Sequence, residues 1–279
     1  MQFTDSHCHL DFPELSNNLP QLLQQCANHK IKRIVVPAVY PEHWQRVLAL
    51  HDIAKKNHVE IACALGIHPW FIISHPTSNQ VNKQIDLHQK LLAEKVNERR
   101  ESIVAIGECG IDVFKAKKNT DSEQALQNNL TLQQEFFEMQ LSIAKENGLP
   151  VIVHHCQSHH YILPLLKQYN LDKSGVIHAF SGSYQQAKEY IELGFKLGIG
   201  GTITYPRAKK TIKAITKLPL NSLLLETDAP AMPPLGKQGE VNSPLSIDEI
   251  FQALAAIRTE SPKEIAAQLE ENNNQLFFS

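Results

Sequence analysis

The chain has 279 residues, of which 42% are hydrophobic and 20% are charged. This ordinary globular composition excludes a disordered, fibrous or disulfide-scaffold protein. The length suits one large domain or two small ones, and α/β barrels alone use about 250 residues. The 27 basic and 29 acidic side chains give a net charge of −2, which excludes a protein that coats nucleic acid through bulk electrostatics.

The cysteines and the apolar segments indicate a reducing, aqueous environment. The 5 cysteines are scattered and form no Cys-x-x-Cys pair, a pattern that disfavours a disulfide framework. The first residues have neither the basic flank nor the apolar segment of a signal peptide, and no apolar run approaches the roughly 18 residues that a membrane span needs. We therefore expect a cytoplasmic protein without a membrane segment.

Short β-branched runs alternate with longer amphipathic stretches along the whole chain. Several of these runs contain stretches that are apolar at every position, such as Ile34–Val36 and Leu223–Leu225, as strands buried on both faces of a parallel sheet require. The expected strands are Gln2–Ser6, Ile31–Val39, Glu60–Ile67, Ser102–Gly107, Pro150–His154, Gly175–His178, Phe195–Gly200 and Ser222–Glu226. The expected helices are Pro20–Lys30, Pro41–Lys56, Val81–Arg99, Leu126–Asn147, Tyr161–Tyr169, Ser183–Leu193, Arg207–Lys217, Ile247–Arg258 and Pro262–Glu271.

This alternation continues without a linker or a low-complexity segment. It predicts an α/β fold in which residues 1–279 form a single (β/α)8 TIM barrel. The structural alternative is an open, doubly wound sheet, which would have no strong reason to use all its strand ends for one site.

Metal-capable side chains recur where the expected strands end. His7 and His9 follow the first strand two positions apart, so an extended backbone points both imidazoles to one face. A lone His-x-His pair is a weak signal, but the other strand ends add His68, Glu108, His154, His178 and Asp228. In a barrel these ends surround one rim, which is where barrel active sites lie.

So many imidazoles and carboxylates in a small volume need a common partner. Buried, they are costly unless they pair or bind a metal, and five or six ligands exceed what one tetrahedral zinc ion uses. We therefore expect two divalent ions, with Glu108 as the bridging carboxylate. Mixed imidazole and carboxylate sites accept several ions, so Mg²⁺, Mn²⁺ and Zn²⁺ all stay open. The alternative is a polar network that only caps the barrel.

These motifs resemble, almost end to end, those of the TatD family of metal-dependent deoxyribonucleases. The matching segments are Asp5–His9, Gly66–Pro69, Gly107–Asp112, Leu149–His154, Gly175–Gly182, Gly198–Pro206 and Leu225–Pro230. The last two look most like the YjjV branch of that family. The resemblance implies a first metal bound by His7, His9, Glu108 and Asp228, and a second bound by Glu108, His154 and His178. It also implies hydrolysis of DNA phosphodiester bonds, usually with Mg²⁺ or a similar ion.

Two positions depart from the family pattern. Cys156 stands where the family commonly has an arginine, two residues after the histidine of strand five. The segment Val113–Lys115 lacks the usual aromatic pair. Both departures bear on the substrate and leave the metal ligands in place.

Further residues near the rim have expected roles in catalysis. We expect Asp228 to accept a proton from the attacking water. His68 would contact the substrate phosphate or the leaving oxygen, although its Gly-x-His-Pro segment could instead form a turn. Lys115 and Arg207 follow strands four and seven, so they are candidate phosphate contacts or simply solvated side chains. Asp112 is expected to support the site without binding metal.

The histidines after His154 are expected to lie beyond the end of strand five. His155, His159 and His160 would then be surface or helix-start residues, although His159 could reach the substrate.

Two other functions stay open. A related barrel metallo-hydrolase would act on a small phosphoester, ester or amide, but many such barrels bridge their metals with a modified lysine where this chain has Glu108. A nucleic-acid-binding protein could also retain metal without turnover. We expect DNA or a smaller phosphoester as the substrate, no protein partner, and a monomer.

Overall fold

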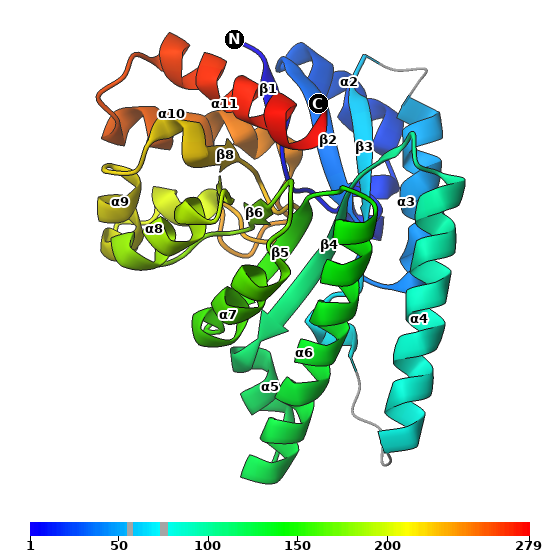
Figure 1. The fold of residues 1–279 in the computed structure, drawn as a ribbon. Coiled ribbons are helices and arrows are strands. Elements are labelled where there is room, and N and C mark those ends of the chain that lie inside the picture. Colours follow the sequence, from blue (N-terminus) through cyan, green and yellow to red (C-terminus); the bar gives the residue numbers. More distant parts are fainter. Residues whose placement is uncertain (55–57, 73–77) are drawn as a thin grey trace.

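The computed structural model describes residues 1–54, 58–72 and 78–279, without the side chains of residues 78–82. The described residues form an eight-stranded parallel sheet in which the strands follow one another in chain order. The strands are β1 (Phe3–Asp5), β2 (Ile31–Pro37), β3 (Glu60–Leu65), β4 (Ile103–Asp112), β5 (Val151–Cys156), β6 (Gly175–Ile177), β7 (Lys196–Ile199) and β8 (Leu223–Leu225). After β1, the backbone N–H of Ser6 donates to the carbonyl oxygen of Leu225 at 2.9 Å, so the sheet curves round until its two edges meet (Figure 1).

The helices lie outside this sheet, as the TIM-barrel prediction requires (Figure 1). Long helices α4 and α6 pack on one another, and α6 also packs on β4. The helices are α1 (Pro13–Ser16), α2 (Leu19–Asn28), α3 (Pro41–Ala54), α4 (Ser78–Glu98), α5 (Val113–Asn119), α6 (Glu123–Glu146), α7 (His159–Tyr169), α8 (Tyr184–Glu192), α9 (Lys209–Ile215), α10 (Ile247–Ile257) and α11 (Pro262–Phe277). No helix among the described residues is both long and apolar enough to cross a membrane.

Two separate apolar clusters reflect the alternation of side chains along the strands. The larger cluster lies between the sheet and the helices. The smaller one contains alternate strand residues such as Ile152, Val176 and Leu224, together with Leu276 and Phe277 from the end of α11. Because side chains two positions apart share a face, this second row fills the barrel interior. In β5, β6 and β8 the same row continues into polar side chains at the carboxyl end of the strand.

The structure confirms the predicted strands but extends two of them. β4 ends at Asp112, not at Gly107, and β5 ends at Cys156, not at His154. The reason is continued pairing of these two strands, in which Ile111 lies opposite His155. The prediction that His155 follows the strand is therefore wrong, whereas His159 and His160 do open helix α7.

The helix predictions hold with small shifts, and two short helices were not predicted. α1 and α5 are the additions; α5 follows β4 directly, with the Asp112 side chain accepting from the backbone N–H of Lys115. The last two residues predicted for the helix at 41–56 lie outside the described residues.

Candidate metal centre

Seven side chains converge at the carboxyl end of the barrel, and we call them the rim cluster. His154, His178 and Glu226 stand two positions after the interior residues Ile152, Val176 and Leu224, so the inward-facing row delivers polar groups at the rim. The structure brings these predicted site residues together at one end of the barrel. The rim cluster consists of His7, His9, His68, Glu108, His154, His178 and Asp228.

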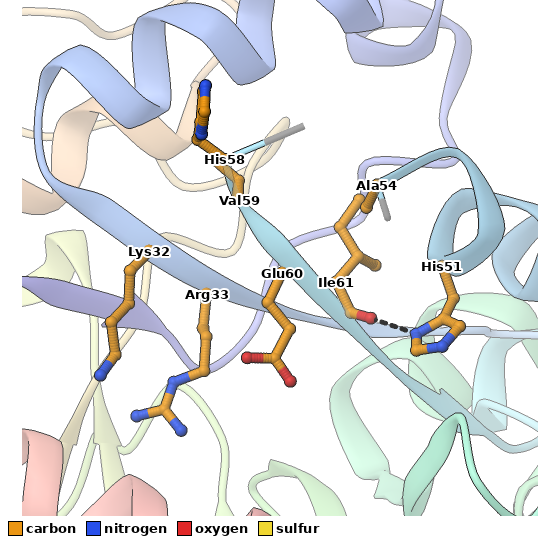
Figure 2. Close-up of a pocket in the computed structure, with 8 residues that line it drawn as sticks. All are labelled: Lys32, Arg33, His51, Ala54, His58, Val59, Glu60 and Ile61. Carbon is orange, nitrogen blue, oxygen red and sulfur yellow. Dashed lines mark hydrogen bonds between the residues drawn. The ribbon is translucent and has the colours of Figure 1, made fainter. Parts of the chain in front are cut away.

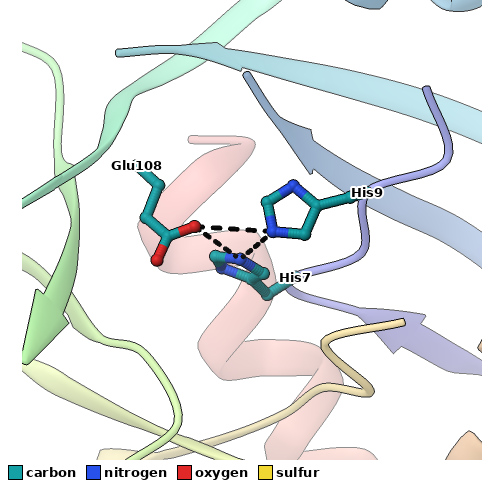
Figure 3. A group of neighbouring side chains, drawn as sticks. All are labelled: His7, His9 and Glu108. Atoms are coloured by element: carbon teal, nitrogen blue, oxygen red, sulfur yellow. Dashed lines mark hydrogen bonds and ion pairs between the residues drawn. The ribbon is translucent and has the colours of Figure 1, made fainter. Parts of the chain in front are cut away.

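One half of the rim cluster joins the two histidines after β1 to two carboxylates. The Nε2 atoms of His7 and His9 lie 3.2 Å apart and 3.2 and 3.5 Å from Oε2 of Glu108. Asp228 Oδ1 lies 3.7 and 3.6 Å from the same two nitrogens. Figure 3 shows both imidazoles and the Glu108 carboxylate pointing to one place. Ligand atoms about 2.1 Å from one ion in a tetrahedral site lie about 3.4 Å apart, so this spacing suits one cation.

The other half gathers around the second oxygen of Glu108. Oε1 of this residue lies 2.9 Å from Nδ1 of His154, 3.3 Å from Nε2 of His68 and 3.8 Å from Nε2 of His178. Glu108 therefore offers one carboxylate oxygen to each half, as a bridging ligand would. His178 also lies 3.8 Å from Asp228 Oδ1, so it stands between the two halves.

The outer nitrogens of three imidazoles meet oxygen atoms that orient the rings. His9 Nδ1 lies 3.1 Å from the carbonyl oxygen of Pro37. His154 Nε2 lies 3.1 Å from Asp112 Oδ2, and His178 Nδ1 lies 3.0 Å from Glu226 Oε1. Metal-binding histidines commonly use their outer N–H in this way, which fixes the tautomer and the ring.

His68 is arranged differently from these three imidazoles. Its Nδ1 accepts a hydrogen bond from the backbone N–H of Trp70 at 3.1 Å, so in the neutral ring the proton sits on Nε2. This Nε2–H lies 3.3 Å from Glu108 Oε1 and faces the cluster as a donor. A nitrogen that carries a proton cannot at the same time bind a metal ion, so the geometry favours a hydrogen-bonding role for His68.

Burial and mutual charge set the ionisation of the cluster. Burial lowers the pKa of His68 to about 4, so this imidazole is neutral near pH 7. Burial acts in the same direction on His178, but Glu226, Asp228 and Glu108 outweigh it and raise the pKa of His178 to about 10. For Glu108, burial is outweighed by the surrounding imidazoles, which hold its pKa well below the usual range. The carboxylate is therefore charged and available to a cation.

Glu226 and Asp5 lie within the motifs found in the sequence, but no role was predicted for either. Glu226 is fully buried and accepts from the backbone N–H of Ala179 at 2.6 Å as well as contacting His178. Asp5 is also fully buried; it accepts from the backbone N–H and the hydroxyl of Thr227, at 2.9 and 2.6 Å. Each is a carboxylate at the buried end of a strand, and a buried carboxylate needs a partner. This is the feature of the sequence that could have predicted a role for them.

The three candidate substrate contacts lie at different distances from the cluster. His68 belongs to it, as described above. The Lys115 ammonium group lies 4.9 Å from the ring centre of Trp70, whose ring stands next to His68. Arg207 stacks on Tyr205 in the segment after β7, so its guanidinium is engaged outside the cluster.

His159, which sequence reasoning left as a possible substrate contact, is engaged elsewhere. Its Nε2 lies 2.9 Å from Glu189 Oε2 on helix α8, and its ring packs against Tyr190.

A hollow with a volume of about 400 Å³ lies at the end of the barrel opposite the rim cluster. Figure 2 shows it where β2 and β3 begin, lined by Lys32, Arg33 and Glu60 among others. The Arg33 guanidinium is already paired with Glu270 at 3.1 Å. This end of a barrel commonly contributes to stability rather than chemistry, so the rim cluster is the candidate site.

Comparison with known proteins gives matches over nearly the whole chain. Residues 4–278 match the family model described as "TatD related DNase". The chain is 40% identical to the uncharacterized metal-dependent hydrolase YjjV of Escherichia coli K12 over 276 residues, covering 99% of this chain and 98% of YjjV. An uncharacterized metal-dependent hydrolase of Haemophilus influenzae is 37% identical, with 99% of this chain and all of the relative covered.

The same relationship appears in three dimensions. The crystal structure of YjjV, a TatD homologue from Escherichia coli, superimposes with a TM-score of 0.86, covering 99% of this chain and 98% of that one. The family resemblance and the barrel expected from the sequence are both confirmed.

Proposed function

We propose that this chain, which belongs to the TatD family of metal-dependent hydrolases, is a deoxyribonuclease that cleaves DNA phosphodiester bonds. The observation that carries the proposal is the convergence of five imidazoles and the Glu108 and Asp228 carboxylates on one small volume at the barrel rim. We further propose a monomeric cytoplasmic enzyme with one domain, residues 1–279, that needs no protein partner.

The donor set fits two divalent ions that share Glu108. His7, His9 and Asp228 would complete the site at Oε2 of Glu108, while His154 and His178 would complete the site at Oε1. Divalent ions bound there would polarise a phosphoryl oxygen and lower the pKa of a coordinated water. Imidazole and carboxylate donors suit Mg²⁺, Mn²⁺ or Zn²⁺ to different degrees, so the identity of the ion is left to experiment.

Asp228 is the proposed general base. Its carboxylate is 13% exposed and is the least buried of the carboxylates facing the cluster, so a water molecule can reach it. Its backbone N–H donates to the carbonyl oxygen of His7 at 2.9 Å, which holds the side chain beside both histidines. A carboxylate positioned in this way can accept the proton of the attacking water.

His68 and the two basic residues are the proposed phosphate contacts. The Nε2–H of His68 can donate to a non-bridging oxygen or to the leaving oxygen. Lys115 supplies a positive charge beside the cluster, whereas Arg207 would act at longer range, by steering the polyanion. Cys156 replaces the arginine common in the family and carries no positive charge. Lys115 would therefore contribute more to phosphate binding.

The second candidate is hydrolysis of a small phosphoester, ester or amide by the same centre. It is favoured by the absence of the usual arginine at position 156, because a small substrate needs fewer phosphate contacts than a polymer. A nucleic-acid-binding protein that keeps metal without turnover is the third reading, and the near-complete ligand set argues against it.

One experiment separates these functions. The purified protein is stripped of metal, reloaded with Mg²⁺, Mn²⁺ or Zn²⁺, and incubated with single- and double-stranded oligonucleotides and with phosphomonoester, ester and amide substrates. Resolved product lengths then distinguish removal of end nucleotides from internal cleavage. We expect oligonucleotide cleavage that is lost in Glu108→Gln and kept in Glu60→Gln, a control at the opposite end of the barrel. Turnover of the small substrates alone would refute the proposal.

A further inference from the structure

Trp70 is a large aromatic side chain held at the surface beside the rim cluster. It is 54% exposed, whereas the other tryptophan, Trp44, is 4% exposed. The Trp70 ring centre lies 5.1 Å from that of His68 and 6.2 Å from that of His154. A phosphoryl group bound by the cluster would therefore bring an attached group next to this ring.

Hydrogen bonds on both sides of the residue fix the indole in place. Its Nε1–H donates to Asp112 Oδ2 at 2.6 Å, and its backbone N–H donates to His68 Nδ1. Asp112 Oδ2 also lies 3.1 Å from His154 Nε2, so the carboxylate links the indole directly to an imidazole of the cluster. With its polar atom already used, the exposed indole offers a flat apolar surface whose orientation is set before any ligand arrives. Such preorganisation lowers the entropic cost of binding.

A positive charge stands over one face of this ring. Asp112 Oδ1 accepts from the backbone N–H of Lys115 at 2.7 Å, and the Lys115 ammonium group lies 4.9 Å from the indole centre. Sites for single-stranded nucleic acid combine these two elements, with an aromatic ring for the base and a cation for the backbone phosphate.

We propose that Trp70 is a specificity-determining residue on which an unpaired nucleobase of the substrate stacks. A base within a duplex is already stacked on its neighbours, whereas an unpaired base leaves a face free for an aromatic side chain. The inference rests on the proposed phosphodiesterase function and deepens it, since it adds a preference for single-stranded ends or loops.

The first test compares two small substrates that differ only in their bases. These are the thymidine dinucleotide TpT and its analogue in which both bases are replaced by hydrogen. We expect Trp70→Ala to lower kcat/KM for TpT about tenfold, which corresponds to about 1.4 kcal/mol, and to leave the abasic analogue within about twofold. Trp70→Phe should keep most of the TpT activity. The control Leu87→Ala removes an equally exposed side chain on α4 and should change neither.

Equal losses on both substrates, or no loss on TpT, would overturn the role of Trp70. If the wild type cleaves no phosphodiester at all, the proposed function fails, and binding alone then decides the inference. For this purpose Trp44→Phe leaves Trp70 as the single tryptophan of the chain, whose fluorescence can be excited selectively over that of the 6 tyrosines. If that variant does not fold, the difference between wild type and Trp70→Phe gives the same signal.

Thymidine 5′-monophosphate and deoxyribose 5-phosphate are the two probes for this measurement. Stacking of a base on the indole should quench its fluorescence with thymidine monophosphate, whereas the sugar phosphate should leave it unchanged. Quenching by both probes alike, or by neither, would refute stacking on Trp70 whatever the enzyme hydrolyses.

Discussion

The carboxylate of Glu226 and the imidazole of His178 lie 3.0 Å apart, entirely within the protein. Glu226 faces the outer nitrogen of the ring, Nδ1, while Nε2 on the other side points to Glu108 and Asp228. This arrangement orients the ring and strengthens Nε2 as a donor to a cation. In the proposed metal centre, Glu226 would therefore act through His178 without being a ligand itself.

Glu226→Gln should weaken metal binding while preserving the fold. The amide retains the size of the carboxylate but removes its charge, so the ring loses its negative partner. Loss of such a partner typically lowers metal affinity 10- to 100-fold. Isothermal titration with Mn²⁺ measures the change, and Glu271→Gln on the exposed side of α11 is the matched control. Unchanged affinity would show that Glu226 is only a buried structural residue.

Gly198 provides the space that Glu226 occupies. A β-carbon at position 198 would lie 2.1 Å from Glu226 Oε2, whereas one at Gly200 would lie no closer than 3.6 Å to its neighbours. Gly198→Ala should therefore displace the carboxylate, lower Tm by several degrees and reduce metal affinity, since overpacking in a dense interior costs about 1–3 kcal/mol. Gly200→Ala should leave both nearly unchanged. Similar thermal melts and titrations for the two variants would contradict this account of Gly198.

The bonds between Asp5 and Thr227 join the first and last strands of the barrel. Thr227→Val retains the shape of the side chain but leaves Asp5 Oδ2 without its 2.6 Å hydrogen bond. An unsatisfied buried acceptor costs about 1–3 kcal/mol, and urea unfolding should show a loss of this size. The exposed Thr216→Val should change the free energy of unfolding by less than about 0.5 kcal/mol. If Thr227→Val loses no more free energy of unfolding than this control, the hydrogen bond between Thr227 and Asp5 does not stabilise the closed barrel.

Sequence reasoning reached the barrel and the cluster because both follow from simple periodicities. Alternation of buried strands and amphipathic helices predicts the fold, and polar residues such as His154 and His178 stand out at the ends of apolar strands. Boundaries were less accurate: β4 runs to Asp112 because pairing with β5 continues beyond the apolar residues. Apolar content alone cannot show that extension.

The partners that orient the ligands were harder to find. Glu226 lies in a motif with Asp228, two positions away, and nothing in the sequence says which carboxylate faces a cation and which faces a ring nitrogen. In the sequence, Trp70 is likewise an ordinary aromatic residue after a turn. Only the structure shows that its indole N–H donates to Asp112. These assignments depend on contacts between segments far apart in the chain, which local patterns do not carry.

Metal binding should release protons near neutral pH. In the metal-free protein, burial alone would lower the pKa values of His154 and His178. At His154 this effect is outweighed by Asp112 and Glu108. At His178 it is outweighed by Glu226, Asp228 and Glu108. The resulting values are about 9 and about 10. Both imidazoles therefore carry a proton at pH 7 that a metal ion must displace, so affinity for Mn²⁺ should rise with pH up to about 9–10. Titrations at pH 7 in buffers of different ionisation enthalpy count the released protons.

The same pKa values make a further prediction for the metal-free protein. Histidine in an unfolded chain has a pKa of about 6.5, so the raised values at His154 and His178 stabilise the folded state. This stabilisation is complete below about pH 6.5 and is lost as the pH rises through about 9–10. The metal-free protein should therefore unfold at lower urea concentration at pH 10 than at pH 7, and the metal-loaded protein should show a smaller change. Metal binding at pH 7 without proton release would mean that the two imidazoles are already neutral, and the roles given to Asp112 and Glu226 would then be wrong.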